Sequence, residues 1–102
     1  MHIITNKALK AFYEVHADAA HSLIAWYNTA RKTQWKSVMD VRKAYPHTDT
    51  VRVANGRTVT VFNIAGNKYR LVTGIHYDRN KIFVLKVMDH KQYSLNRWKE
   101  AL

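Results

Sequence analysis

Apolar residues recur at helical spacing in the first half of the chain. Between residues 7 and 16 they return every three or four positions, and the same spacing between 19 and 31 places Leu23 and Trp26 on one face. This spacing predicts two helices, over 7–16 and 19–31, and Asp18 is expected to cap the second. Because almost nothing separates them, we expect an antiparallel helical hairpin.

Short elements flank this hairpin. We expect a short strand from His2 to Ile4 that joins the sheet. A third, short helix is expected over 37–44, and it ends at Tyr45-Pro46. After Pro46 the chain becomes rich in β-branched and aromatic residues, which favours strands. Strands are expected at 51–54, 57–64, 68–77 and 81–88.

Turn residues separate the expected strands. Asn55-Gly56 predicts a two-residue hairpin turn. Two further turns are expected at 65–67 and 78–80, which makes the strands an antiparallel meander. The final segment, 91–101, predicts a short helix that carries Trp98.

These elements predict an α+β fold in a single domain over 1–102. The N-terminal strand and the helical hairpin would pack on one face of an antiparallel β-sheet, with the other face free and a short C-terminal helix at the end. Alternation along 68–77 places Tyr69 and Leu71 toward the helices and Arg70 on the open face.

Alternation in the last strand places Ile82, Val84, Lys86 and Met88 on one face and Phe83, Leu85 and Val87 on the other. Lys86 would then share the open face with Arg70. The aromatic residues Phe62, Tyr69 and Phe83 are assigned mostly to the core.

The net charge of the chain indicates the class of partner that it binds. Seventeen Lys and Arg face seven Asp and Glu, giving a net charge of +10. Residues 51–102 carry ten of the basic and three of the acidic residues. Such a surplus attracts polyanions, so nucleic acid or an acidic protein is the expected partner.

Composition also limits the cellular setting. The sequence has no cysteine, no signal-peptide pattern and no apolar run of the roughly 20 residues that span a bilayer. We therefore expect a cytoplasmic protein without a membrane partner. The seven acidic residues are scattered singly, so no carboxylate cluster for Mg²⁺ is expected, nor any other metal or cofactor.

Two segments carry a resemblance to a known family. Residues 61–72 read VFNIAGNKYRLV, and residues 87–93 read VMDHKQY. Both resemble segments of the HigB toxins, within the RelE-like superfamily, although Asp89 stands where those toxins have Thr. Trp26, the stretch 30–35 and Tyr45-Pro46 also lie where HigB sequences place similar residues, so the likeness covers nearly the whole chain.

The resemblance implies a function. HigB toxins are small ribonucleases that cut messenger RNA, typically on the translating ribosome, and a helix-turn-helix antitoxin holds them inactive. DNA would be contacted only through that antitoxin. Related toxins carry catalytic lysines in the strand before Tyr-Arg-Leu, whereas this chain has Val61 and Asn63 there. The lysine role is therefore missing or has moved, with Arg57 and Lys68 as candidates.

Metal-free RNA cleavage needs a base, an acid and a cation at the phosphate. Arg70 is the candidate phosphate clamp, because its fork matches two phosphate oxygens. His90 is the first choice for proton transfer, since histidine exchanges protons near neutral pH. Tyr93 is expected to donate a proton or to stack on a base, and Lys68 completes the catalytic set. The RNA-binding candidates are Arg57, Asn67, Lys86 and Lys91.

Other interpretations remain open from the sequence. The main alternative is a non-catalytic RNA- or ribosome-binding module that uses the same basic sheet, which would expose aromatic side chains along its strands. A toxin homologue that has lost activity is a further alternative, given Asp89 and the missing lysines. Each candidate cation has an ordinary surface role as its competing interpretation, and Tyr93 could equally pack under the last helix.

Overall fold

A computed structural model describes residues 1–4 and 6–102 of the chain, and the side chain of Asn6 lies outside this description. The elements, in chain order, are β1 (His2–Ile4), α1 (Asn6–Val15), η1 (Ala17–Ala19), α2 (Ala20–Lys32), α3 (Val38–Ala44), β2 (Asp49–Arg52), β3 (Thr58–Ile64), β4 (Tyr69–His76), η2 (Tyr77–Arg79), β5 (Lys81–Asp89), α4 (His90–Ser94) and α5 (Trp98–Ala101).

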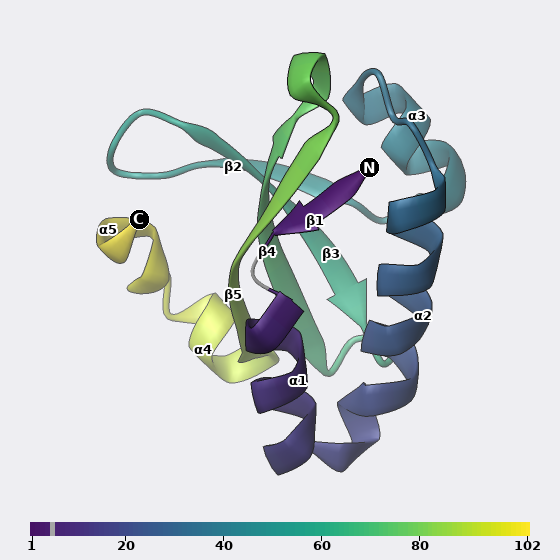
Figure 1. The fold of residues 1–102 in the computed structure, drawn as a ribbon. Helices are drawn as coiled ribbons and strands as arrows, with labels where there is room; N and C mark the ends of the chain where they lie inside the picture. Colours follow the sequence, from purple (N-terminus) through teal and green to yellow (C-terminus); the bar gives the residue numbers. More distant parts are fainter. Residues whose placement is uncertain (5) are drawn as a thin grey trace.

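The strands form one sheet in the order β1-β5-β4-β3-β2 (Figure 1). β2 to β5 are antiparallel neighbours, and β1 joins the edge parallel to β5. The predicted α+β fold, with an antiparallel sheet, an N-terminal strand and helical hairpin, and a short C-terminal helix, is confirmed.

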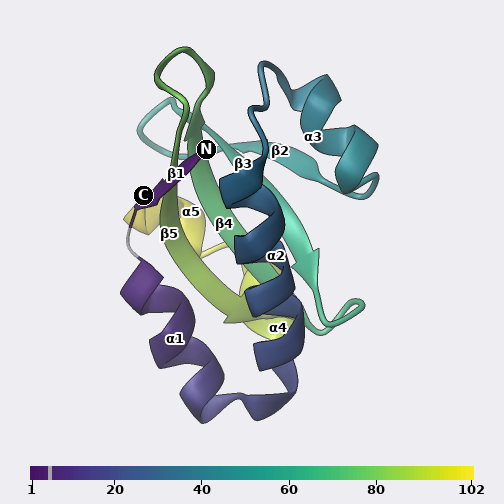
Figure 2. The ribbon, with the colours of Figure 1, turned by 45° about the vertical axis from the view of Figure 1, so that its right-hand side comes forward.

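The main core lies between the sheet and helices α1 and α2, which cover one face (Figure 2). Leu9, Leu23 and Trp26 from the helices meet strand residues such as Phe62 and Leu71, and all five are buried. The predicted alternation of β4 is confirmed, because Tyr69 and Leu71 pack in this core while Val72 packs on the opposite face.

The opposite face of the sheet is not free, so that prediction is wrong. A second core forms there, in which Trp98 of α5 packs with Val61, Val72 and Met88. Figure 2 shows α4 and α5 behind the sheet, on the side away from α1 and α2. The strands present valine and methionine on this side, and covering them removes apolar surface from water. The two C-terminal helices therefore divide this face into covered and open regions.

A bulge in β5 changes which of its residues share a face. Val72 lies opposite Lys86 but Thr73 lies opposite Val84, so Leu85 is the extra residue. Ile82 and Val84 consequently join the main core while Met88 joins the second core. The prediction that these residues share one face is wrong. Lys86 does lie across from Val72, on the face of Arg70, as predicted.

The same bulge affects the aromatic residues. Phe62 and Tyr69 are buried in the main core, as expected. Phe83 instead lies opposite Gly74, half-buried, and its ring meets His76 at 5.1 Å between centroids. Its assignment to the core is wrong, because its register places it on the face away from α1 and α2.

Three local predictions are wrong: the two-residue turn between β2 and β3, the cap at Asp18 and the single helix over 91–101. The β2–β3 loop has three residues, because Val53 N donates to Arg57 O, and Gly56 takes a φ of +86°. Residue Ala19, not Asp18, precedes the first turn of α2. The segment expected as one helix over 91–101 forms α4 and α5, separated by Asn96 with a φ of +62°. Among the described residues, no helix is long and apolar enough to cross a membrane.

Candidate functional site

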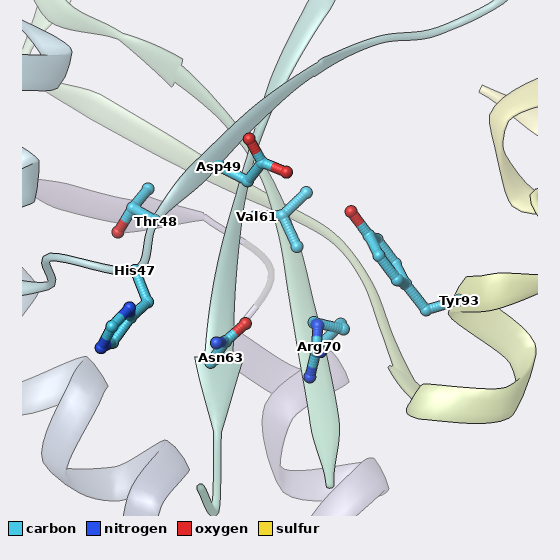
Figure 3. Close-up of a pocket in the computed structure, with 7 residues that line it drawn as sticks. All are labelled: His47, Thr48, Asp49, Val61, Asn63, Arg70 and Tyr93. Carbon is cyan, nitrogen blue, oxygen red and sulfur yellow. The ribbon is translucent and has the colours of Figure 1, made fainter. Parts of the chain in front are cut away.

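A polar cleft opens on the sheet face that carries α4 and α5. Its volume is about 370 Å³, and its lining residues are His47, Thr48, Asp49, Val61, Asn63, Arg70 and Tyr93 (Figure 3). The lining comes from five places in the chain: the loop after α3, the strands β2, β3 and β4, and the helix α4.

Strand pairing brings the floor of the cleft together. Asn63 lies directly across from Arg70, and Asp49 lies across from Val61. Directly opposed residues on one face have Cβ atoms about 4.5–5.5 Å apart. Register therefore holds these side chains side by side, although 21 sequence positions separate Asp49 from Arg70.

The loop after α3 supplies the wall of the cleft. Thr48 is buried, and its hydroxyl donates to the carbonyl of Tyr45 at 2.7 Å. The Arg42 guanidinium donates to the carbonyl of Thr48 at 3.4 Å. These bonds fix the backbone on both sides of His47, whose own side chain is exposed at the cleft.

Arg70 is the most confined charge in the cleft, with 8% of the residue exposed. Its Nη1 donates to the carbonyls of Asn67 and Tyr69, each at 3.1 Å, and Nη2 donates to Asn67 Oδ1 at 2.8 Å. Within residues 1–4 and 6–102, no carboxylate forms an ion pair with Arg70. A confined cation held only by neutral acceptors retains its full charge for an anionic ligand.

Tyr93 completes the cleft from α4. The guanidinium carbon of Arg70 lies 5.4 Å from the centre of the Tyr93 ring, and the ring hydroxyl points toward Asp49 (Figure 3). Burial raises the pKa of this hydroxyl, the Asp49 charge raises it further, and Arg70 opposes the rise. The hydroxyl is therefore protonated at neutral pH and available as a donor.

Of the four predicted catalytic residues, the cleft contains Arg70 and Tyr93. His90 is the first residue of α4, is exposed, and does not line the cleft. Its backbone N–H donates to the Lys68 carbonyl at 2.9 Å, and its Nδ1 lies 3.3 Å from Ser94 Oγ. The role of His90 in proton transfer stays a prediction.

Lys68 is engaged elsewhere. Its Nζ lies 3.1 Å from Asp18 Oδ2, and the Tyr69 hydroxyl donates to Asp18 Oδ1 at 2.6 Å. Asp18 thus ties the β3–β4 turn to η1. The pair is exposed, and such pairs are readily exchanged for other partners.

The predicted RNA-binding residues have different surroundings. Asn67 holds Arg70 through two acceptor atoms, which makes it a support for the predicted phosphate clamp. Arg57, Lys86 and Lys91 are exposed outside the cleft. Arg57 lines a separate hollow of about 640 Å³, and Lys86 lines another of about 240 Å³. Their contacts with RNA stay predictions.

The sequence did not single out His47, Thr48 or Asp49 as site residues. No spacing motif marks them, and only the packing of the α3 loop against β3 brings them to Arg70. Asn63 did carry a signal, because the resemblance predicts catalytic lysines in its strand and alternation places Asn63 on the same face as Val61. Among the described residues, no three His, Asp or Glu side chains gather as metal ligands would.

The Asp18 contacts predict a pH-dependent effect on stability. The Tyr69 hydrogen bond, then Lys68, holds the pKa of Asp18 below its ordinary value. A lowered folded-state pKa stabilises the fold above the unfolded pKa of about 3.9, and this stabilisation is lost as pH falls through the folded pKa. We expect Asp18→Ala to lower the Tm at pH 7, with the difference shrinking below pH 4.

Thermal unfolding, followed by circular dichroism at pH 7 and again below pH 4, measures this difference in Tm. The matched control is Asp78→Ala, an exposed acid in η2 at the other end of the sheet. We expect its Tm to stay near that of the unsubstituted protein. A Tm for Asp18→Ala that equals the control at pH 7 would contradict the prediction.

Comparisons with known proteins agree on one family. Residues 19–96 match the family described as HigB_toxin, RelE-like toxic component of a toxin-antitoxin system. The chain is 32% identical over 93 residues to the mRNA interferase toxin HigB of Escherichia coli (strain K12), covering 91% of this chain and 88% of that protein. The mRNA interferase HigB of Shigella flexneri gives the same values, and that of Escherichia coli O6:H1 is 24% identical over the same coverage.

Proposed function

The chain belongs to the HigB toxins, the RelE-like toxic components of toxin–antitoxin systems, and we propose that it is an mRNA interferase. In detail, we propose a metal-independent endoribonuclease that cleaves translated mRNA on the ribosome. A cognate helix-turn-helix antitoxin would hold it inactive. The relatives named above are mRNA interferases, and the cleft contains the types of group that RNA cleavage requires.

The observation that carries this proposal is the Arg70–Tyr93 pair. A confined guanidinium, without an acidic partner among the described residues, lies over the ring of Tyr93, and the neutral hydroxyl of that ring lines the same polar cleft. The cation would bind the non-bridging oxygens of the scissile phosphate and stabilise the charge that develops on them. The hydroxyl would supply a proton to the departing oxygen.

The proposed reaction is an internal transfer. The ribose 2′-oxygen attacks phosphorus, a base accepts the 2′-OH proton, and the bond from phosphorus to the 5′-oxygen breaks. An acid protonates that 5′-oxygen. The products are a 2′,3′-cyclic phosphate and a free 5′-hydroxyl, so atoms and charge balance without a metal or an added water.

A histidine is the proposed base, because it accepts a proton near neutral pH. His47 lines the cleft with Arg70, whereas His90 stands outside it at the start of α4. The geometry therefore favours His47 as the base. The sequence favours His90 for the same role. Asp49 lies across from Val61 at the same cleft and could orient the base or the 2′-hydroxyl.

A non-catalytic RNA-binding module would use exposed aromatic rings on its strands. Within the described part of the chain, the strand residues Phe62 and Tyr69 are buried, and Phe83 is half-buried against His76. The described strands therefore expose basic side chains but no row of aromatic rings, which favours the enzyme.

The decisive experiment measures toxicity and cleavage together. We expect expression of the chain to arrest growth and to produce new 5′ ends within translated messages, and co-expression of the antitoxin to relieve the arrest. Purified protein with ribosomes and message should yield cyclic-phosphate ends, at a rate that a chelator of free Mg²⁺ does not change once ribosomes are programmed. Soluble, abundant protein that neither arrests growth nor cleaves message would overturn the proposal.

A further inference from the structure

We propose that Trp98 is a positioning residue for cleavage, which holds the Tyr93 ring so that its hydroxyl edge, and not a ring face, meets the RNA. This inference rests on the proposed function, since it assigns a role within that reaction. It also makes a statement about Tyr93 that can be measured without substrate.

Trp98 contacts Tyr93 in two independent ways. The two rings are stacked, with centroids 5.2 Å apart and planes 19° from parallel. The Trp98 Nε1–H donates to the Tyr93 carbonyl at 3.0 Å. One contact orients the ring and the other fixes the backbone of α4. Stacked aromatic pairs contribute beyond the area they bury, so this arrangement resists rotation of the Tyr93 side chain.

Arg70 holds the same ring from the sheet. Its guanidinium carbon lies 5.4 Å from the ring centre, whereas Trp98 reaches the ring from α5. A nucleobase that stacked on Tyr93 where either group lies would have to displace that group. The hydroxyl remains accessible, because Tyr93 lines the cleft and its oxygen points toward Asp49 (Figure 3). The sequence left two roles open for Tyr93, proton donation and stacking on a base. These contacts of the ring favour proton donation.

The position of Trp98 is itself fixed by the β2–β3 hairpin. The Ala54 N–H donates to the Lys99 carbonyl at 3.0 Å, and Asn55 Nδ2 donates to the Leu102 carbonyl oxygen. Trp98 is 3% exposed and packs on Val61 and Met88. The hairpin and the second core thus set where α5 lies, and α5 in turn sets where Tyr93 lies.

The test compares two substitutions at Trp98. Trp98→Leu keeps an apolar side chain but removes the stacked ring and the N–H donor, while Trp98→Phe keeps a ring. Misplacing a reacting group by about 1 Å can cost about 10²-fold in rate. We expect single-turnover cleavage by Trp98→Leu to fall by about that factor, with RNA affinity within about 2-fold. Trp98→Phe should recover most of the rate.

Titration of Tyr93 gives a readout without substrate. Burial is the main cause of the raised Tyr93 pKa, and Trp98 supplies part of that burial. In Trp98→Leu the pKa should move back toward its ordinary value, measured by NMR of labelled tyrosine with Tyr93→Phe to assign the signal. Tyr93→Phe removes the hydroxyl and keeps the ring. If Tyr93 acts as the acid, this variant should cleave slowly, whereas a stacking role would survive the substitution.

The matched control is Trp26→Leu, the same change at a tryptophan buried in the main core. It should lose thermal stability but keep the Tyr93 titration and the rate of the folded protein. If Trp98→Leu cleaves at the unsubstituted rate, or if its rate falls only as much as that of Trp26→Leu, the inference is overturned. If the unsubstituted protein never cleaves, the proposed function fails. Independently of cleavage, an unchanged Tyr93 pKa in Trp98→Leu would contradict the statement that Trp98 holds the Tyr93 ring.

Discussion

Replacing Arg70 by alanine is expected to slow mRNA cleavage about 10²–10³-fold, the typical loss when one group that stabilises transition-state charge is removed. Arg70 is the confined cation of the cleft, and within the described part of the chain its hydrogen bonds go to neutral oxygens of Asn67 and Tyr69. Charge develops on the phosphate oxygens during the reaction, so the rate should fall more than the affinity for RNA.

Arg70→Lys sharpens this prediction. Lysine keeps the charge but lacks the planar fork that binds two oxygens and the flat group that lies against Tyr93. We expect a rate between those of the alanine variant and the unsubstituted protein. Asn67→Ala should lower the rate in the same direction but less, because it removes one of the acceptors that hold the guanidinium.

Primer extension on a translated message, under single-turnover conditions, measures these rates. The control is Arg79→Ala, an exposed arginine in η2 outside the cleft. Circular dichroism should show that each variant folds. Cleavage by Arg70→Ala at the rate of the Arg79 control would mean that the clamp lies elsewhere.

Loss of the histidine that transfers the proton is expected to cost about 10²–10⁴-fold in rate. The two candidates differ in their evidence. His90 belongs to the segment that resembles the family, whereas His47 lines the cleft that contains Arg70. We expect the larger loss for His47→Ala, because a base must reach the proton that it accepts within hydrogen-bonding distance.

The dependence of rate on pH distinguishes proton transfer from other roles. The variant that lacks the base should lose the limb of the profile in which the rate rises with pH, while a variant that lost only an RNA contact should keep it. His21→Ala on the exposed side of α2 is the control. A large loss with His90→Ala and none with His47→Ala would return the role to His90 and require α4 to contact the RNA at its first residue.

The order of the elements could be predicted from the sequence, because short-range patterns determine it. Helical spacing marked α1 and α2, and turn residues marked the boundaries between β2, β3, β4 and β5. Arg70 and Tyr93 were likewise predicted as site residues, through alternation for the first and through the family resemblance for both.

The bulge at Leu85 could not be predicted from alternation. An alternation with a period of two continues without interruption along this apolar strand. It therefore predicts a single face for Ile82, Val84, Lys86 and Met88. Only pairing with β4 showed that Val72 faces Lys86 while Thr73 faces Val84. A single extra residue reverses the face of all residues beyond it, and no local signal marks where this occurs.

The sequence by itself determined the class of fold, the basic charge and the two central residues of the cleft. The tertiary structure alone decided the rest of the cleft, because the position of the loop after α3 and the register of β2 bring His47 and Asp49 into the cleft that contains Arg70. It also decided that α5 covers part of the second face and contacts Tyr93 through Trp98. The physical reason is that helices and strands follow from interactions between near neighbours in the chain, whereas a site depends on contacts between residues far apart in it.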